Sequence, residues 1–264
     1  MAAVAREGAG APLVQRAKGA PPWTLIAMCG RDRAELVGPC LASVRKAWPD
    51  LSLLFHRDPA DTELRKLDLR MRGATWVEEI DLHPELAGRK RVAAMRAAAA
   101  TWACAAGYQR VLFLDSDILV DPGAGAELER LWRMRPTPDA AVALTRCAVY
   151  DSGRYERAGQ PLRGASLRTH GLGMALAFAA GAALQRAASQ PIRDSWDSAW
   201  CTTVAINVVV QPEQSWAIHE GRGSGLCQQR SPGLDVTHPT PQLEARWQHG
   251  NQQAIGSGPR EAHR

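Results

Sequence analysis

The chain has 264 residues, of which 45% are hydrophobic and 22% are charged, and its formal net charge is +5. This length fits one large domain or two small ones with a sizeable core. The longest apolar stretch, 174–184, is too short and too rich in alanine to cross a bilayer, and the first 22 residues lack the apolar region of a secretory signal. We therefore expect a soluble protein without an integral membrane segment.

The cysteines and the positive charge add two indications. None of the six cysteines forms a C-x-x-C pair, so neither a zinc site nor a thioredoxin-like motif is indicated. Without an export signal, we expect free thiols in a reducing compartment and a cytoplasmic protein. Almost all of the positive charge is arginine, which suits bidentate phosphate contacts, although a general bias toward arginine and alanine explains it equally well.

The first half of the chain alternates between short apolar runs and segments with helical spacing. After a tail at 1–22 rich in alanine, glycine and proline, strands are predicted at 24–29, 51–58, 75–80 and 111–114. Helices are predicted at 34–47, 61–72, 85–106 and 123–135, with Gly107 as the cap of the third. This alternation predicts an α/β layered fold.

The second half of the chain is less regular. Strands are predicted at 140–145 and 207–212, a helix at 195–205, and a glycine-flanked apolar segment leading into a helix at 171–188. We expect 150–170 to be a long polar loop that holds Arg154, Arg157, Arg163 and Arg168. With no internal repeat and no long linker, one domain is expected over 23–249, followed by a second tail over 250–264.

Two aspartates follow the apolar run VLFL at 111–114. Asp115 and Asp117 would lie at the carboxyl edge of a parallel sheet, where ligands of such sheets bind. If the chain turns there, both carboxylates can face one hard divalent cation such as Mg²⁺ or Mn²⁺. That ion would offset their repulsion and stabilise charge on a diphosphate leaving group. The alternative is a solvent-exposed turn.

Two enzyme classes place D-x-D after an apolar strand. The haloacid-dehalogenase-like phosphatases also need a later lysine, and this chain has none after Lys90. From about Thr24 to Gly225 the chain instead resembles the GT-A-fold, nucleotide-sugar-dependent glycosyltransferases, in particular those of the family 2 type. The stretches that carry the resemblance occur in order: TLIAMCGRDR (24–33), LLFHRDPAD (53–61), GRKRVAAMRAA (88–98), FLDSD (113–117), and GLGMALAFAAGAAL (171–184) followed by DSWDSAW (194–200).

The resemblance implies a Rossmann-like GT-A fold, with a mostly parallel central sheet flanked by helices, and a binding site for a nucleotide-diphosphate sugar. Cys29 and Arg31 match the nucleotide-contacting turn after the first strand. Asp58 matches an acidic residue that meets the base or ribose. Arg91, with Arg89 nearby, matches the basic helix start before the D-x-D strand.

The resemblance also implies a metal site for Mn²⁺ or Mg²⁺. Asp117 is expected to bind the metal directly, and Asp115 to bind it through water or to contact the ribose, with Ser116 between them in the donor site. The resemblance favours His219 as the third ligand, because glycines follow it closely and could wrap a diphosphate with backbone N–H groups. His238 remains the alternative.

On the acceptor side, Asp197 is the candidate general base of an inverting transferase, where it would take the proton of the attacking hydroxyl. Asp194 is its rival, and both residues also suit a helix start together with Ser195. Without a base at this position, a retaining mechanism becomes the better expectation. Trp196 and Trp200 flank Asp197 and could pack against a sugar or in the core.

The sequence therefore predicts a metal-dependent hexosyltransferase that uses a nucleotide sugar, with a UDP-sugar favoured and an unknown hydroxyl acceptor. Where many relatives end the acceptor segment with a basic pair, this chain has AFAAGAAL. A polyanionic acceptor such as hydroxyl-modified DNA would suit the arginines of 150–170. The alternatives are a nucleotidyltransferase that makes nucleotide sugars and a non-catalytic nucleotide-sugar-binding protein. No Walker motif or nucleic-acid-binding signature is present.

Overall fold

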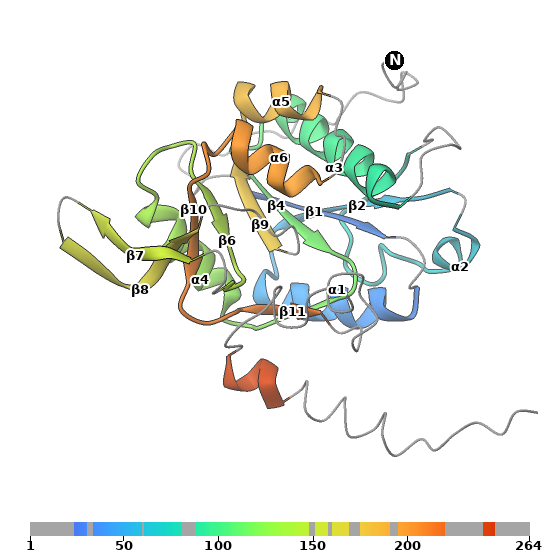
Figure 1. Ribbon diagram of the computed structural model, residues 1–264. Helices are drawn as coiled ribbons and strands as arrows, with labels where there is room; N and C mark the ends of the chain where they lie inside the picture. Colours follow the sequence, from blue (N-terminus) through green and yellow to red (C-terminus); the bar gives the residue numbers. More distant parts are fainter. Residues whose placement is uncertain are drawn as a thin grey trace, which may run out of the picture.

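The computed structural model describes residues 24–30, 34–59, 61–80, 88–147, 151–157, 160–168, 175–190, 195–219 and 240–245. Within these ranges the side chains of 30, 88–89, 151–157, 160–163 and 219 lie outside the description. The described elements form one α/β domain in which helices cover both faces of a large central sheet (Figure 1).

The first half of the fold consists of parallel strands with helical connections, as predicted. Strands β1, β2, β3 and β4 are joined by parallel pairing in the order β3-β2-β1-β4. A helix was expected over 61–72, but only the short helix α2 forms there. Asp61 caps its amino end, and the chain adopts a φ of 110° at Gly73 before β3 begins. The elements are β1 (Thr24–Gly30), α1 (Ala34–Ala47), β2 (Ser52–Arg57), α2 (Thr62–Arg65), β3 (Trp76–Glu79), α3 (Gly88–Ala105) and β4 (Arg110–Asp115).

Gly107 ends α3 as the sequence predicted. Its φ is 77°, and the N–H of Tyr108 donates to the carbonyl of Ala103, five residues back, at 3.1 Å. This closure satisfies an orphan carbonyl of the last helical turn. It delivers the chain directly into β4, the strand that carries the paired aspartates.

The second half extends the sheet beyond β4 with strands of both directions. β9 pairs antiparallel with both β4 and β6, and β10 pairs parallel with β6. The complete order is β3-β2-β1-β4-β9-β6-β10-β8-β7, and β5 and β11 form a separate two-stranded sheet. The remaining elements are β5 (Ile118–Val120), α4 (Ala124–Met134), β6 (Ala141–Ala143), β7 (Asp151–Arg157), β8 (Gln160–Arg168), β9 (Ala175–Ala179), α5 (Ala182–Ala188), α6 (Trp196–Thr203), β10 (Val209–Pro212) and β11 (Ala217–His219).

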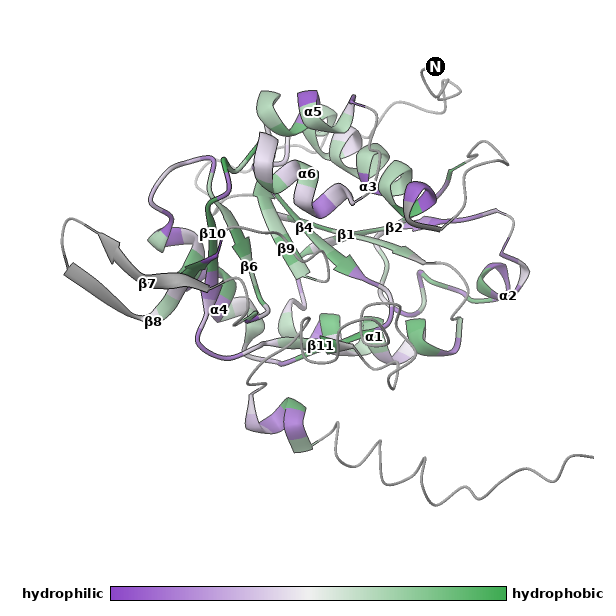
Figure 2. Ribbon diagram, in the orientation of Figure 1, coloured by the Kyte–Doolittle hydropathy of each residue, from purple (hydrophilic) through white to green (hydrophobic). Residues whose placement is uncertain are grey.

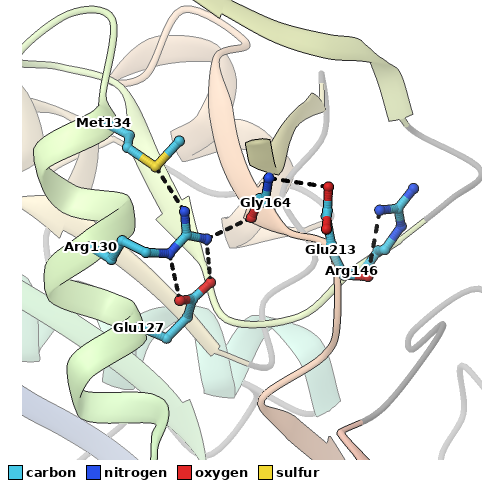
Figure 3. A network of polar contacts seen from close by, with 6 residues as sticks. All are labelled: Glu127, Arg130, Met134, Arg146, Gly164 and Glu213. Carbon is cyan, nitrogen blue, oxygen red and sulfur yellow. Dashed lines mark hydrogen bonds and ion pairs between the residues drawn. The ribbon is translucent and has the colours of Figure 1, made fainter. Parts of the chain in front are cut away.

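The expectation of a polar loop over 150–170 is wrong. β7 and β8 pair antiparallel and form the outer edge of the sheet, where Figure 1 shows them as a projecting hairpin. Gly164 of β8 anchors it, since its carbonyl accepts from Nη2 of Arg130 at 2.6 Å and its N–H donates to Glu213 at 3.1 Å (Figure 3). Arg130 is itself held by Glu127 of α4. Arg130 and Glu213 therefore hold the hairpin to the rest of the domain, and a sequence pattern does not reveal such long-range contacts.

Alternation along the strands separates two cores. In β1, Ile26 and Met28 face α1 and α4, whereas Leu25 and Ala27 face α3, α5 and α6. Figure 2 shows the central strands as hydrophobic, in contrast to the purple patches on the helices. In the described part of the chain, no helix combines the length and apolar composition needed to cross a membrane. Five cysteines are free thiols, as expected: Cys29, Cys40, Cys104, Cys147 and Cys201.

Candidate functional site

The carboxyl ends of β1, β2 and β4 lie side by side at one edge of the sheet. The parallel register places Cys29 of β1 opposite both His56 of β2 and Asp115 of β4. Asp58 follows the end of β2 at the same edge. The topology thus gathers three of the predicted site residues, Cys29, Asp58 and Asp115, at the end of the sheet where ligands of α/β proteins bind.

The D-x-D segment forms the connection between β4 and β5. Asp115 is the last residue of β4, Ser116 and Asp117 make the turn, and Ile118 begins β5. Ser116 is buried, Asp117 is half-buried, and the side chain of Asp115 is 32% exposed. The chain therefore turns as it leaves the strand, which is the condition under which both carboxylates can face one cation.

The pKa of Cys29 depends on the charged side chains at this edge of the sheet. Burial raises the pKa of Cys29, the nearby charge of Arg96 opposes that rise, and Asp115 and Asp117 both add to it. The charges of both carboxylates therefore reach the Cys29 thiol near the end of β1. A neutral thiol here offers a packing surface rather than a nucleophile.

Asp58 and Arg91 form a buried ion pair. Nη2 of Arg91 donates to Oδ1 of Asp58 at 2.6 Å, and Nε donates to Oδ2. The carboxylate is 1% exposed and the guanidinium 8% exposed. The resemblance implied a base or ribose contact for Asp58 and a basic helix start at Arg91. The structure joins the two residues as a bidentate pair that ties the end of β2 to the first turn of α3.

Sequence reasoning missed Arg96, which lies one and a half turns further along α3. Its Nη2 donates to Oδ1 of Asp115 at 2.7 Å, and the residue is 1% exposed. The 88–98 stretch contains three arginines, and the resemblance implied a role for the two at the helix start. Arg96 follows Arg91 by five residues, which is about 140° around an α-helix, so helical spacing alone could not have placed both arginines on the side of the sheet.

His219 is brought close to the D-x-D turn by strand pairing. β11 runs antiparallel to β5, and His219 at the end of β11 pairs with Ile118, the residue after Asp117. The two positions are 101 residues apart in sequence, and neither strand was predicted from the sequence. The side chain of His219 lies outside the description, so its role as a metal ligand stays a prediction.

Asp197 lies in the first turn of α6 and is half-buried. Its Oδ1 accepts a hydrogen bond from the Ser195 hydroxyl and another, at 2.9 Å, from the N–H of Ser198. The carboxylate thus takes part in local bonding at the helix start, one of the two roles considered from the sequence. These bonds fix its position without excluding proton transfer.

Trp196 and Trp200 are core residues. Their ring centroids are 5.1 Å apart, and each packs edge-on against Phe113 of β4, at 5.3 and 5.4 Å. Both rings are buried. Of the two roles the sequence allowed, packing is therefore the one that these tryptophans have, and they fasten α6 to the strand that leads to Asp115.

Arg168 was expected in an exposed loop where it could contact a polyanionic acceptor, but it is a buried residue of β8. It is 0% exposed, its Nη1 donates to the carbonyl of Thr145 at 3.2 Å, and burial lowers its pKa. Within the described structure its Nε and Nη2 have no hydrogen-bond partner. A large polyanion cannot reach this guanidinium. The side chains of Arg89, Arg154, Arg157 and Arg163, and the residues Arg31, Asp194 and His238, lie outside the described residues.

The described carboxylates fit a hard divalent ion that is shared with a substrate. Mg²⁺ commonly uses one or two protein carboxylates and completes its shell with water and phosphate oxygens. Asp115 and Asp117 supply two, at a partly exposed turn. The described side chains contain no group of three histidines, cysteines or acids that would hold a metal by themselves. This donor set suits an ion that arrives with a diphosphate.

Comparison with known proteins supports the fold. No protein-family model and no curated protein matches the sequence. Among solved structures, that of S. aureus TarS, a GT2-family glycosyltransferase, is similar, with a TM-score of 0.50 and 12% sequence identity. The match covers 74% of this chain and 36% of TarS, so the chain spans only about a third of that protein. The domain has a mixed α/β, GT-A-like fold with a large, mainly parallel central sheet.

Proposed function

We propose that the protein is a metal-dependent glycosyltransferase that moves a sugar from a nucleotide-diphosphate sugar to a hydroxyl acceptor. The observation that carries this proposal is the turn at Asp115 and Asp117, placed at the carboxyl end of the central strand in a GT-A-like sheet. Arg96 balances part of the charge of Asp115. A divalent cation with its diphosphate would offset the remaining repulsion between the two carboxylates.

The proposed donor site has a metal end and a nucleotide end. Asp117 would hold Mn²⁺ or Mg²⁺ directly, Asp115 would act through water or the ribose, and His219 would complete the protein ligands, with His238 as the alternative. When bound, the ion would offset the charge that develops on the diphosphate as it leaves. Toward the nucleotide, Asp58 and Arg91 would act as one preformed unit. The remaining contacts would come from Cys29, Arg31 and Ser116, with a UDP-sugar as the favoured donor.

The reaction would be a displacement at the anomeric carbon. The acceptor oxygen forms a bond to that carbon while the bond to the diphosphate oxygen breaks, and the hydroxyl proton passes to a carboxylate. We assign this base role to Asp197, with Asp194 as its rival, and an inverted anomeric configuration follows from the single displacement. Ser195 and Ser198 would orient the carboxylate, as they do in the structure.

A donor panel tests the proposal. We would measure melting temperatures with UDP-, GDP-, TDP- and CMP-sugars, with and without Mn²⁺, and follow nucleotide release from any sugar that binds. Ligand at about 100 times its Kd stabilises the folded state by about 2.7 kcal/mol, which is a rise of roughly 5 °C or more for a domain of this size. One nucleotide class should give this rise, and only with Mn²⁺.

The matched variants are Asp117→Asn and Asp139→Asn. Asp139 is exposed and precedes β6, so it lies at the amino edge of the sheet, opposite the candidate site. Loss of several kcal/mol of charge stabilisation should lower kcat/KM in Asp117→Asn by about 100-fold or more and leave Asp139→Asn unchanged. Equal behaviour of the two variants, or no Mn²⁺-dependent shift with any donor, would overturn the proposal. Binding without turnover would identify a sugar-binding protein, and synthesis of the donor from a nucleoside triphosphate would identify a nucleotidyltransferase.

A further inference from the structure

The guanidinium of Arg96 spans the boundary between β1 and β4. Nη1 donates to the carbonyl of Ala27 in β1 at 2.8 Å, and Nη2 donates to the carbonyl of Leu114 in β4 at 2.6 Å. Nη2 also donates to Oδ1 of Asp115 at 2.7 Å. These acceptors belong to two strands and one carboxylate, so they fix the plane of the guanidinium and, through it, the orientation of the Asp115 side chain.

Two aromatic rings complete the surroundings of Arg96. Its Cζ lies 5.7 Å from the ring centroid of Phe113 and 5.4 Å from that of Trp196. Phe113 is two residues before Asp115, and Trp196 begins α6 immediately before Asp197. One buried cation therefore contacts the strand that ends in the D-x-D segment and the helix that carries the candidate base.

Arg96 makes hydrogen bonds beyond the single ion pair that would neutralise its charge. A buried guanidinium needs a counter-ion, and Asp115 supplies it. The Nε of Arg96 has no hydrogen-bond partner within the described structure, so the side chain leaves one donor unused while its terminal nitrogens make the contacts to β1, β4 and Asp115. A lysine could not reproduce this arrangement, because its ammonium is a compact charge without a planar fork.

We propose that Arg96 is a positioning residue that holds the Asp115 carboxylate and the first turn of α6 in one fixed arrangement. Its importance for transfer rests on the proposed function, since it would keep the donor-side carboxylate aligned with Asp197. The mechanical link itself is a property of the folded chain and exists without any ligand. A residue that only fills space between α3 and the sheet would couple to neither group.

The matched control is Arg110, which belongs to the same strand as Asp115 but lies at its amino end. It is equally buried, forms an ion pair with Glu129, donates to the Thr24 hydroxyl at 2.7 Å and stacks on Trp132 at 4.8 Å. Arg96→Lys changes the arginine of α3 that contacts the carboxyl end of β4, and Arg110→Lys makes the same chemical change at the amino end of that strand. Arg96→Met supplies a variant without charge.

The first experiment needs no ligand. A double-mutant cycle of Arg96→Met and Asp115→Asn, read by denaturant unfolding, should show that the two effects on the unfolding equilibrium constant deviate from additivity by roughly tenfold. Amide exchange over Trp196–Thr203 should be about tenfold faster in Arg96→Lys than in Arg110→Lys. Additive effects in the cycle, or equal exchange of α6 in the two lysine variants, would overturn the proposal whether or not the protein is a transferase. If a variant does not fold, Arg96→Lys with Asp115→Asn gives the same cycle.

The second experiment separates positioning from electrostatics. The affinity for Mn²⁺, measured with and without UDP, should fall about tenfold in Arg96→Met and stay constant in Arg110→Lys. Tighter Mn²⁺ binding in Arg96→Met would show that Arg96 acts as a competing cation, and would contradict positioning. If wild-type protein binds neither Mn²⁺ nor a donor, the proposed function fails while the cycle and the exchange data still decide the role of Arg96.

Discussion

His56 shows how one side chain at the candidate site is constrained by its surroundings. It belongs to β2 beside Cys29, is 2% exposed, and donates from Nδ1 to the carbonyl of Met95 at 3.1 Å. Burial lowers the pKa of His56 to about 4, the hydrogen bond to Met95 opposes this shift, and the positive charge of Arg96 adds to it. The imidazole is therefore neutral throughout the physiological range.

This depressed pKa predicts acid sensitivity. Above pH 6.5 His56 is neutral in both states and contributes no pH dependence. Between pH 6.5 and 4 the unfolded chain binds the proton and the folded chain does not, so the free energy of unfolding falls by about 1.4 kcal/mol per pH unit, about 3 kcal/mol in all. Denaturant titrations of His56→Gln should show that the free energy of unfolding falls less steeply between pH 6.5 and 4 than in wild type, by about 1.4 kcal/mol per pH unit. Between pH 7 and 8 the two proteins should have the same pH dependence. An identical slope below pH 6.5 would contradict a buried neutral histidine.

Sequence reasoning could single out Asp58, Asp115 and Asp117 because each lies at or just after the end of a predicted strand, and such positions meet at one edge of a parallel sheet. Arg96 could not be found in this way, because it lies inside a helix rich in alanine and its contacts depend on which helical face meets the sheet. Its partners Ala27 and Trp196 lie 69 and 100 residues away in sequence.

At the scale of elements, the sequence predicted those with a strong period and missed those that depend on partners. The bounds of α1 were predicted to the residue, and β1, β4 and α4 to within about one residue at each end. β5 and β11 have three residues each, too few for a period, and they exist because they pair with each other. β7 is the edge strand and β8 lies between it and β10. Both are polar in sequence, and polar strands near the edge of a sheet are easily taken for a loop.

The hairpin anchor predicts the effect of one glycine. Gly164 has a φ of 87°, and a Cβ at this position would lie 3.3 Å from Nη1 of Arg130. Gly164→Ala should therefore lower the free energy of unfolding by about 1–2 kcal/mol and speed amide exchange in β8. Gly181→Ser is the comparison, since a Cβ there meets nothing within 4 Å and the hydroxyl can cap α5. Equal stability of Gly164→Ala and wild type would show that the hairpin does not depend on this contact.

At the scale of the whole molecule, residues 240–245 are bound to β5, to the turn that follows it and to β11. The Thr240 hydroxyl donates to Oδ2 of the buried Asp121 at 2.7 Å, and the Thr240 N–H donates to the carbonyl of Ser215 at 3.0 Å. Leu243 packs against Leu119 and Ile218, which belong to β5 and β11. Residues 240–245 therefore cover the small sheet that continues from the D-x-D turn.

Removal of this hydroxyl should loosen the segment. Thr240→Val leaves Oδ2 of Asp121 without this donor, which should reduce the free energy of unfolding by about 1–3 kcal/mol. Thr101→Val removes a hydroxyl that donates to the Ala97 carbonyl at an exposed position of α3, and should change stability by less than about 0.5 kcal/mol. Chemical denaturation and limited proteolysis after 240 compare the two. Equal stability would mean that the backbone bond to Ser215 and the packing of Leu243 hold the segment without the hydroxyl.

The order of strands in the sheet also sets an order of events during synthesis. β10 lies between β6 and β8, although it is made after both of them. β6 therefore has no partner strand until β9 has been made, and the β7–β8 hairpin has none besides itself until residue 212 has been added. Because an isolated two-stranded hairpin is at best marginally stable in water, we expect β7 and β8 to become stably ordered only when β10 joins them to β6.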